Sequence, residues 1–194
     1  MATSAPRQRR SDGERTYNAI VTAAAALATT EGLHGLSIGR LADHLGMSKS
    51  GLYAHFDSKE ELQLATIDAA GEIFDREVVA PAQAAETPRE RLLALTETFL
   101  SHVERRVFPG GCFFAAVAAE VDTHAGRVRD KIAGFMVGWV STLEELAREA
   151  GLEDPAQVAF EIEGYLLLAN NLFVLTDDPA QLQRARAAVA RLLG

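Results

Sequence analysis

Hydrophobic residues recur at intervals of three and four along most of this chain, and polar residues fill the positions between them. Leu92, Leu95, Phe99 and Val103, for example, fall on one face if this stretch is helical. This period is typical of amphipathic α-helices, and runs of β-branched residues are short. The pattern therefore predicts an all-α fold of about nine helices, with no convincing strand.

Helix start and stop signals divide this pattern into segments. A Ser or Thr followed three residues later by Glu is a capping box, and it occurs at Ser11, Ser58 and Thr87. The tetrapeptide Asp-Pro-Ala-Gln occurs at 154–157 and again at 178–181, which indicates two helix starts and not an internal repeat. The predicted helices span residues 11–30, 37–45, 48–56, 58–79, 87–107, 112–122, 126–150, 156–175 and 179–193.

The second and third predicted helices are short, and their spacing is typical of a helix-turn-helix. Ala42 supplies a small residue where two steeply crossing helices touch, and Gly46 tolerates the positive φ that the turn needs. Ile38 and Leu52 supply apolar contacts that lock the pair together. In such a motif the first helix crosses the DNA backbone and the second enters the major groove.

The exposed positions of the third helix suit DNA, because no acidic residue lies between Ser48 and Phe56. Lys49 and Ser50 can reach base edges, whereas aromatic and imidazole groups nearby are better placed for phosphates. His44 is interpreted as an exposed residue of the preceding helix, with a DNA contact as the alternative. The predicted DNA-binding residues are Ser37, Ser48, Lys49, Ser50, Gly51, Tyr53, His55 and Lys59.

Residues 37–56 read SIGRLADHLGMSKSGLYAHF, and residues 57–62 continue as DSKEEL. This run resembles the TetR-like (tetracycline-repressor type) family of transcriptional regulators, and the resemblance covers about residues 14–65. Leu27 stands where that family commonly has an aromatic residue, and Ser37 replaces a frequent Thr while keeping the hydroxyl. The resemblance implies a homodimeric repressor that leaves a palindromic operator when a small molecule binds its C-terminal domain.

An acidic net charge would disfavour binding to DNA, but the acidic residues are not evenly distributed along the chain. The net charge is −8, but residues 1–60 hold seven Lys and Arg against six Asp and Glu, so the acidity belongs to the remainder. We therefore expect a disordered basic arm over 1–11, a helix-turn-helix domain over 12–57 and an effector-binding and dimerisation domain over 58–194. Arg7, Arg9 and Arg10 of the arm either reach DNA or form a solubilising tail.

The last two predicted helices are the candidates for dimerisation. Residues 156–175 are apolar around nearly the whole helix circumference, so the helix must be covered on every side. A four-helix interface between two copies would achieve this; the alternative is a last helix that folds back on its own core. The predicted interface residues are Ile162, Leu166, Leu168, Leu172, Leu175, Leu182, Ala185, Val189 and Leu192.

Aromatic residues concentrate in the C-terminal part and suggest an unknown, lipophilic small-molecule effector. Aromatic residues at helical spacing also occur in ordinary cores, which is the alternative interpretation. The predicted effector-binding residues are Phe74, Phe99, Phe113, Phe114, Phe135, Met136, Trp139, Tyr165 and Asn170.

Other chemistry has little support in the sequence. The single cysteine, Cys112, excludes an internal disulfide and is interpreted as a small buried hydrophobe, with redox sensing as the alternative. His102, Glu120, Asp122 and His124 lack a metal-ligand spacing and are interpreted as surface polar residues. We expect no metal and no cofactor.

Two other classes of function are weighed against the regulator. A helical enzyme would use carboxylates and His124, but the sequence contains no nucleophile–base pair or phosphate-binding glycine loop, so we expect no enzyme. An architectural DNA-binding protein would leave more than half of the chain without a purpose. The apolar stretches 132–143 and 165–175 are shorter than the roughly 20 residues that a bilayer needs, and no signal peptide is evident, so we expect a cytoplasmic protein that binds no membrane.

Overall fold

Helices account for nearly all regular structure in this protein. The computed structural model describes the backbone of residues 5–194 and the side chains of residues 13–194. The elements are α1 (Ala5–Glu31), α2 (Ile38–Leu45), α3 (Lys49–Tyr53), α4 (Lys59–Phe74), the π-helical segment η1 (Asp75–Val79), α5 (Ala80–Ala82), α6 (Pro88–Glu104), α7 (Phe113–Val121), α8 (Arg127–Glu149), α9 (Pro155–Thr176) and α10 (Ala180–Leu193). Because α4, η1 and α5 are continuous, the described residues form nine helical rods and no strand, which confirms the predicted fold class.

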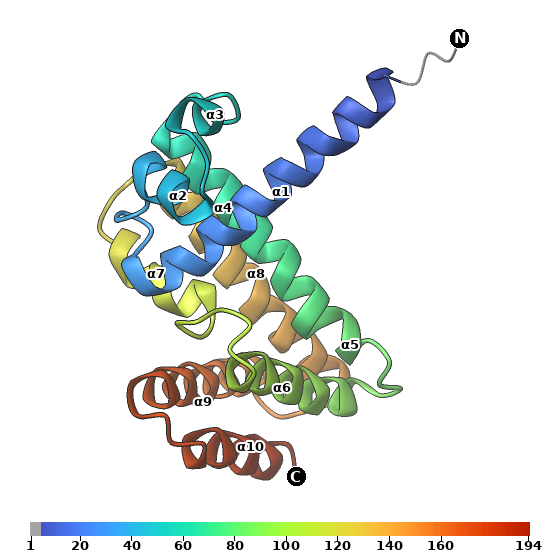
Figure 1. Cartoon of the computed structure of the whole chain (residues 1–194). Coiled ribbons are helices and arrows are strands. Elements are labelled where there is room, and N and C mark those ends of the chain that lie inside the picture. Colours follow the sequence, from blue (N-terminus) through green and yellow to red (C-terminus); the bar gives the residue numbers. More distant parts are fainter. Residues whose placement is uncertain (1–4) are drawn as a thin grey trace.

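The helices are arranged as two connected groups (Figure 1). The short helices α2 and α3 lie at one end beside α1 and α4, and the N-terminal half of α1 projects away from the rest of the molecule (Figure 1). At the other end α9 packs against α8, α10 and α6. Helix α4 packs against both α1 and α8, and α7 packs against both α1 and α8, so these two helices connect the groups.

Several helix starts confirm the local signals in the sequence. Ser58 accepts a hydrogen bond from the backbone N–H of Glu61 at the start of α4. Thr87 and Glu90 form a reciprocal capping box at the start of α6, with Pro88 in the first turn. These caps satisfy backbone donors that have no partner within the first turn of a helix.

The start of α1 differs from the prediction. The helix begins at Ala5 and not at Ser11, so residues 5–11, which were expected to be a disordered arm, continue the helix. The only helix breaker in this stretch, Pro6, lies in the first turn, where its missing N–H costs nothing. Residues 1–4 and the side chains of the predicted basic arm lie outside the described part of the chain.

The rod that begins with α4 also extends past its predicted end at Val79. Its last part changes to π-helical hydrogen bonding, in which the N–H of Ala80 donates to the carbonyl of Asp75. This wider turn accommodates Pro81, which has no N–H to donate and lies in the final turn, α5. The Thr98 hydroxyl on α6 donates to the carbonyl of Val78 at 2.8 Å, so the altered segment is attached to the neighbouring helix.

The hydrophobic core runs continuously through both groups of helices. Ile20 and Ala24 of α1 are buried together with Leu62 of α4, and Leu143 and Ile162 are buried in the C-terminal part. No break in the core marks the predicted boundary between residues 57 and 58, which stays a prediction.

Helix α9 is longer than the apolar stretch of residues 165–175 that the sequence analysis compared with the thickness of a bilayer. It has 22 residues, and by length and composition alone it is the one described helix that could cross a membrane. In this fold it packs against α6, α7, α8 and α10, and 39% of its apolar window is buried.

Candidate functional site

The α2–α3 pair has the geometry of a helix-turn-helix. Gly46 adopts the left-handed conformation with φ 64°, as predicted, and the N–H of Met47 donates to the carbonyl of Ala42 at 2.9 Å. Ile38, Ala42 and Leu52 are buried between the helices and the rest of the domain. The turn is therefore held by backbone hydrogen bonds and the helix pair by apolar contacts.

The outer face of α3 is polar and open to solvent. Lys49 and Ser50 are exposed, and Tyr53 is 60% exposed, which is unusual for so large an aromatic side chain. The hydroxyl of Ser48 caps the helix by accepting from the N–H of Gly51 at 3.1 Å, and it lies 3.2 Å from the Ser50 hydroxyl. A Cβ at Gly51 would lie only 3.1 Å from the Ser48 oxygen, so glycine leaves room for the cap.

Three other predicted DNA-binding residues also make contacts within the chain. Ser37 caps α2 by accepting from the N–H of Arg40, and Lys59 donates to the carbonyl of His34. His55 is half-buried, with its ring centroid 6.4 Å from that of Tyr17. The predicted contacts of these residues with phosphates remain predictions, as does the role of His44, which is exposed on α2.

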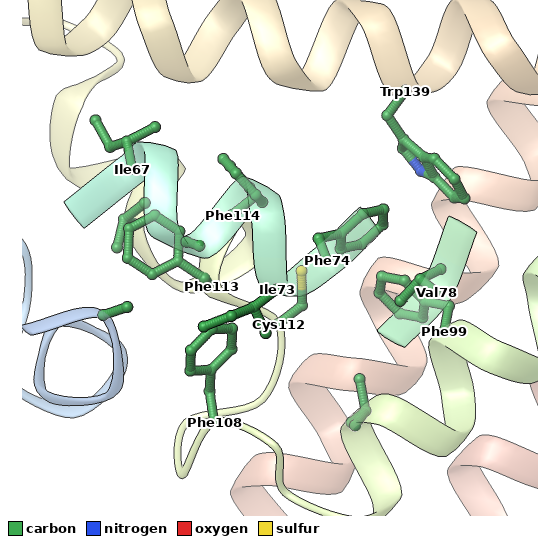
Figure 2. Packing of buried hydrophobic residues seen from close by; sticks show 14 of the residues in the cluster. Ile67, Ile73, Phe74, Val78, Phe99, Phe108, Cys112, Phe113, Phe114 and Trp139 are labelled. Carbon is green, nitrogen blue, oxygen red and sulfur yellow. The ribbon is translucent and has the colours of Figure 1, made fainter. Parts of the chain in front are cut away.

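A small aromatic cavity lies between α4, α6, α7, α8 and α9, and the space in it that the centre of a water-sized sphere can occupy is about 20 Å³, on the order of a single water molecule. Figure 2 shows Phe74 from α4 with Phe99, Phe114 and Trp139 around it. Six of the nine residues predicted to bind an effector line this cavity, whose lining residues are Phe74, Phe99, Cys112, Phe114, Ala115, Phe135, Met136, Trp139, Glu163 and Leu167.

The rings around the cavity pack mostly edge to face. The ring of Phe74 is nearly perpendicular to those of Phe135 and Trp139, at centroid distances of 5.3 and 5.1 Å. Phe114 of α7 stacks on Phe135 of α8 with 3.5 Å between ring centroids and an angle of 5°. This stacked pair holds α7 against α8, so a molecule that entered between the two rings would separate these helices.

Three residues predicted for the effector site lie elsewhere. Phe113 is buried and packs against Phe108 (Figure 2). Tyr165 lines a groove between α9 and α10, and its hydroxyl donates to Glu161. Asn170 is buried and accepts a hydrogen bond from the N–H of Cys112 at 2.9 Å. Periodicity could not separate these positions, because each falls on an apolar helix face whose covering is decided by the fold.

Four cavity residues were not among those predicted, and Glu163 is the charged one; the others are Cys112, Ala115 and Leu167. The indole N–H of Trp139 donates to the Oε2 atom of Glu163 at 2.8 Å. Burial raises the pKa of the Glu163 carboxyl, and the hydrogen bond from Trp139 opposes that shift. The signal was present in the sequence, because Glu163 is an acidic residue on a helix that is otherwise apolar around most of its circumference.

Cys112 is buried at the start of α7 and also lines the cavity. Burial raises the pKa of its thiol to about 11, so almost none of it is thiolate at neutral pH.

The predicted dimer-interface residues divide into buried, half-buried and exposed groups. Ile162, Leu166, Leu182, Ala185 and Val189 are buried within their own chain and are unavailable to a partner, because they pack α9 against α10 and the core. Leu172 and Leu192 are half-buried. Leu168 is 59% and Leu175 79% exposed, and Phe160, which the predicted interface omitted, is 70% exposed on the same helix.

The interpretation of His102, Glu120, Asp122 and His124 as surface residues is wrong for one of them, because His102 is buried. His102 is only 1% exposed. Glu120 at the end of α7 accepts hydrogen bonds from the N–H groups of Leu33 and His34, both at 3.1 Å, and so joins α7 to the loop after α1. Among the described residues no group of three His, Cys, Asp or Glu side chains could hold a metal ion.

Two family models match the chain. Residues 20–66 match the model described as bacterial regulatory proteins, tetR family, and residues 88–189 match the tetracyclin repressor-like C-terminal domain. Together they cover the helix-turn-helix and most of the C-terminal helices.

Individual proteins of known function or structure are also similar. The HTH-type transcriptional activator FasR of Mycolicibacterium smegmatis is 35% identical over 88 residues, which are 44% of this chain and 39% of FasR, so the match spans about two fifths of that relative's length. A TetR transcriptional regulator from Chloroflexus aurantiacus is 26% identical, with a TM-score of 0.85 over 93% of this chain and 94% of that one. AibR, solved in complex with isovaleryl coenzyme A and operator DNA, is 28% identical, with a TM-score of 0.72 over 91% of this chain and 97% of AibR.

Proposed function

The chain belongs to the TetR family of bacterial regulatory proteins, and from this premise we propose that it is a homodimeric repressor released from a palindromic operator by a small molecule. The observation that carries the proposal is the combination of a solvent-exposed recognition helix with an aromatic cavity in the same continuous core. Neither an enzyme nor an architectural DNA-binding protein accounts for both features.

Operator binding would use α3 in the major groove. Lys49 and Ser50 contact base edges, and Tyr53 donates its hydroxyl to a phosphate. The exposure of these three side chains on one short helix supports the proposed contacts with bases and with a phosphate. In a dimer the two α3 helices lie about 34–36 Å apart, or slightly more, to meet successive major grooves.

Dimerisation would use the exposed side of α9 together with α10. Phe160, Leu168 and Leu175 are large apolar side chains exposed on this one helix, and exposed apolar patches are typical of protein–protein interfaces, which supports a partner on this stripe. A second copy that packs the same stripe against this one would cover them with twofold symmetry.

Effector binding would act on the DNA-binding helices through α4 and α7. Phe74 lies on α4 and Phe114 on α7, and both line the cavity, so a ligand that spreads these rings moves both helices. The Glu120 hydrogen bonds then transmit the motion of α7 to the loop after α1. AibR supports this scheme, since it was solved with both isovaleryl coenzyme A and operator DNA.

We assign the protein to the cytoplasm, where its operator lies, and we assign it no catalytic activity. A second regulatory outcome, activation of transcription, is favoured by the similarity of 44% of the chain to the activator FasR.

The test is a salt-dependent gel shift with the full chain and the DNA upstream of its own gene. We expect specific binding to a palindrome that weakens as salt rises, and release by a ligand of the cavity. A reporter gene behind that palindrome distinguishes repression from activation. Binding that is the same for unrelated DNA would contradict the proposal.

A further inference from the structure

Glu163 places a carboxyl group in the aromatic cavity without a cation of the chain beside it. Its Oε2 atom accepts the hydrogen bond from Trp139, while its Oε1 atom makes no hydrogen bond to the described residues and is reached by solvent. Glu163 takes part in none of the ion pairs of the described side chains, and no Lys, Arg or His lines the cavity. The protein therefore holds an acid in an apolar site and supplies no counter-charge for it.

The other walls of the cavity are suited to a positive charge. Phe74, Phe99, Phe114, Phe135 and Trp139 all line it. The face of an aromatic ring carries negative electrostatic potential, which attracts an ammonium group placed within about 6 Å of the ring centroid. Rings and carboxylate thus favour the same sign of charge, while the methionine and leucine side chains favour an apolar surface.

We propose that the effector is a small lipophilic cation, an ammonium whose charge is paired by Glu163 and enclosed by the surrounding rings. This inference rests on the proposed function, because it names the chemical class of the molecule that binds the cavity. The cavity has room for only about one water molecule, so the effector binds as the surrounding rings move apart, which favours a compact molecule.

Other ligand classes fit the site less well. An anion would be repelled by the carboxylate, and no basic side chain among the lining residues would compensate. A neutral apolar molecule would displace water from Glu163 and leave its free oxygen without a partner. A ligand that donates a neutral hydrogen bond would satisfy that oxygen but would make no use of the ring faces.

The experiment compares two molecules of the same shape that differ in charge. Benzyltrimethylammonium carries a quaternary nitrogen where neopentylbenzene has a carbon atom. With the full chain we expect the cation to raise the Tm and to bind in calorimetry about tenfold more tightly than the neutral molecule, since ring faces and a carboxylate both favour it.

Two variants test whether Glu163 causes the preference for the cation over the neutral molecule. Glu163→Gln keeps an oxygen that can accept from Trp139 but removes the charge, and we expect it to lose the tenfold preference. Glu161→Gln is the matched control, because Glu161 lies on the same helix but contacts Gln157 and Tyr165 outside the cavity. The control should keep the preference for the cation.

The outcomes separate this inference from the proposed function. Equal or tighter binding of the neutral molecule, no binding of the cation at millimolar concentration, or a preference that survives in Glu163→Gln would each overturn the cationic effector. Operator binding is measured on the same preparations by gel shift. Its loss would overturn the proposed regulator, whereas intact operator binding without cation binding would overturn only the effector class.

Discussion

At the scale of single residues, side chains that look alike in the sequence have different surroundings in the fold. Tyr53 is exposed on α3, whereas Tyr165 lies in the groove between α9 and α10. His44 is exposed, whereas His102 is almost completely buried. Functional assignments to these residues therefore require the environment of each side chain as well as its type.

The exposed pair on α3 gives a prediction about DNA recognition. Tyr53→Phe removes one hydroxyl donor to a phosphate, so affinity should fall by about 1 kcal/mol, roughly fivefold, for every operator sequence. Ser50→Ala should instead change the relative affinity for operators that differ at one base pair. Gel shifts over a set of operator variants measure both effects. An altered sequence preference in Tyr53→Phe with unchanged affinity would contradict this assignment.

His102 gives a prediction about stability and pH. Neither of its ring nitrogens has a hydrogen-bond partner in the described structure, and burial lowers its pKa to about 4. The nearby Glu77 raises and Arg105 lowers the pKa to smaller extents. The folded state therefore holds this ring neutral at pH values where the unfolded chain already binds a proton.

The protonation of His102 in the folded and in the unfolded protein determines how stability changes with pH. Above about pH 6.5 the His102 ring is neutral in both the folded and the unfolded protein. As the pH is lowered from about 6.5 to 4, only the unfolded chain binds the proton, so the free energy of unfolding should decrease by up to about 3 kcal/mol. Urea denaturation across this range should show the loss in the native chain and a smaller loss in His102→Leu. His124→Gln, at an exposed position, is the control. Parallel curves for the native chain and His102→Leu would rule out this role of His102.

At the scale of elements, the connections of α7 determine how the two groups of helices communicate. Its first turn carries Phe114 into the cavity, and its last turn carries Glu120 to the loop after α1. The loop before α7 also contacts α1, because the N–H of Gly110 donates to the Thr29 hydroxyl and a Cβ at Gly110 would lie 2.0 Å from the Thr29 carbonyl oxygen. A displacement of α7 would therefore change its contacts with α1 directly.

We expect Glu120→Gln to weaken this connection without altering the cavity. The Leu33 and His34 N–H groups each donate to a different oxygen of Glu120, and in glutamine one of these oxygens is replaced by an NH2 group, which cannot accept, so one of the two hydrogen bonds is lost in the same geometry. The effector should bind with unchanged affinity, while about tenfold more of it is needed to release the operator. Calorimetry measures the first quantity and gel shift the second. Asp122→Asn, an exposed change two residues later, should leave both unchanged.

At the scale of the whole molecule, the exposed stripe on α9 predicts where two copies of the chain pack together. Leu168→Glu puts a charge in a surface that a partner would cover, while the folded monomer tolerates it because the position is 59% exposed. We expect a monomer in light scattering and affinity for the palindrome reduced at least about 100-fold, since linked binding of two half-sites is lost. Val137→Glu, at a 66% exposed position on α8, should remain dimeric. A dimeric Leu168→Glu would place the interface elsewhere.

Features that depend on local chemistry could be predicted from the order of residues alone. Ser58, Thr87 and Asp154 cap their helices because a side-chain oxygen close in sequence reaches a free N–H, and Gly46 turns the chain because it tolerates positive φ. The all-α class and the helix-turn-helix follow from such signals.

Which apolar residues line the cavity, which are exposed and which lie in the core depends on how the helices pack, and the sequence does not show this. Periodicity identifies the apolar face of a helix but not the element that covers it, and so Ile162 and Leu168 looked equivalent although one is buried and the other exposed. For the same reason the contacts of Glu163 and Glu120 became evident only in the fold, which brings these residues to Trp139 and to the loop after α1.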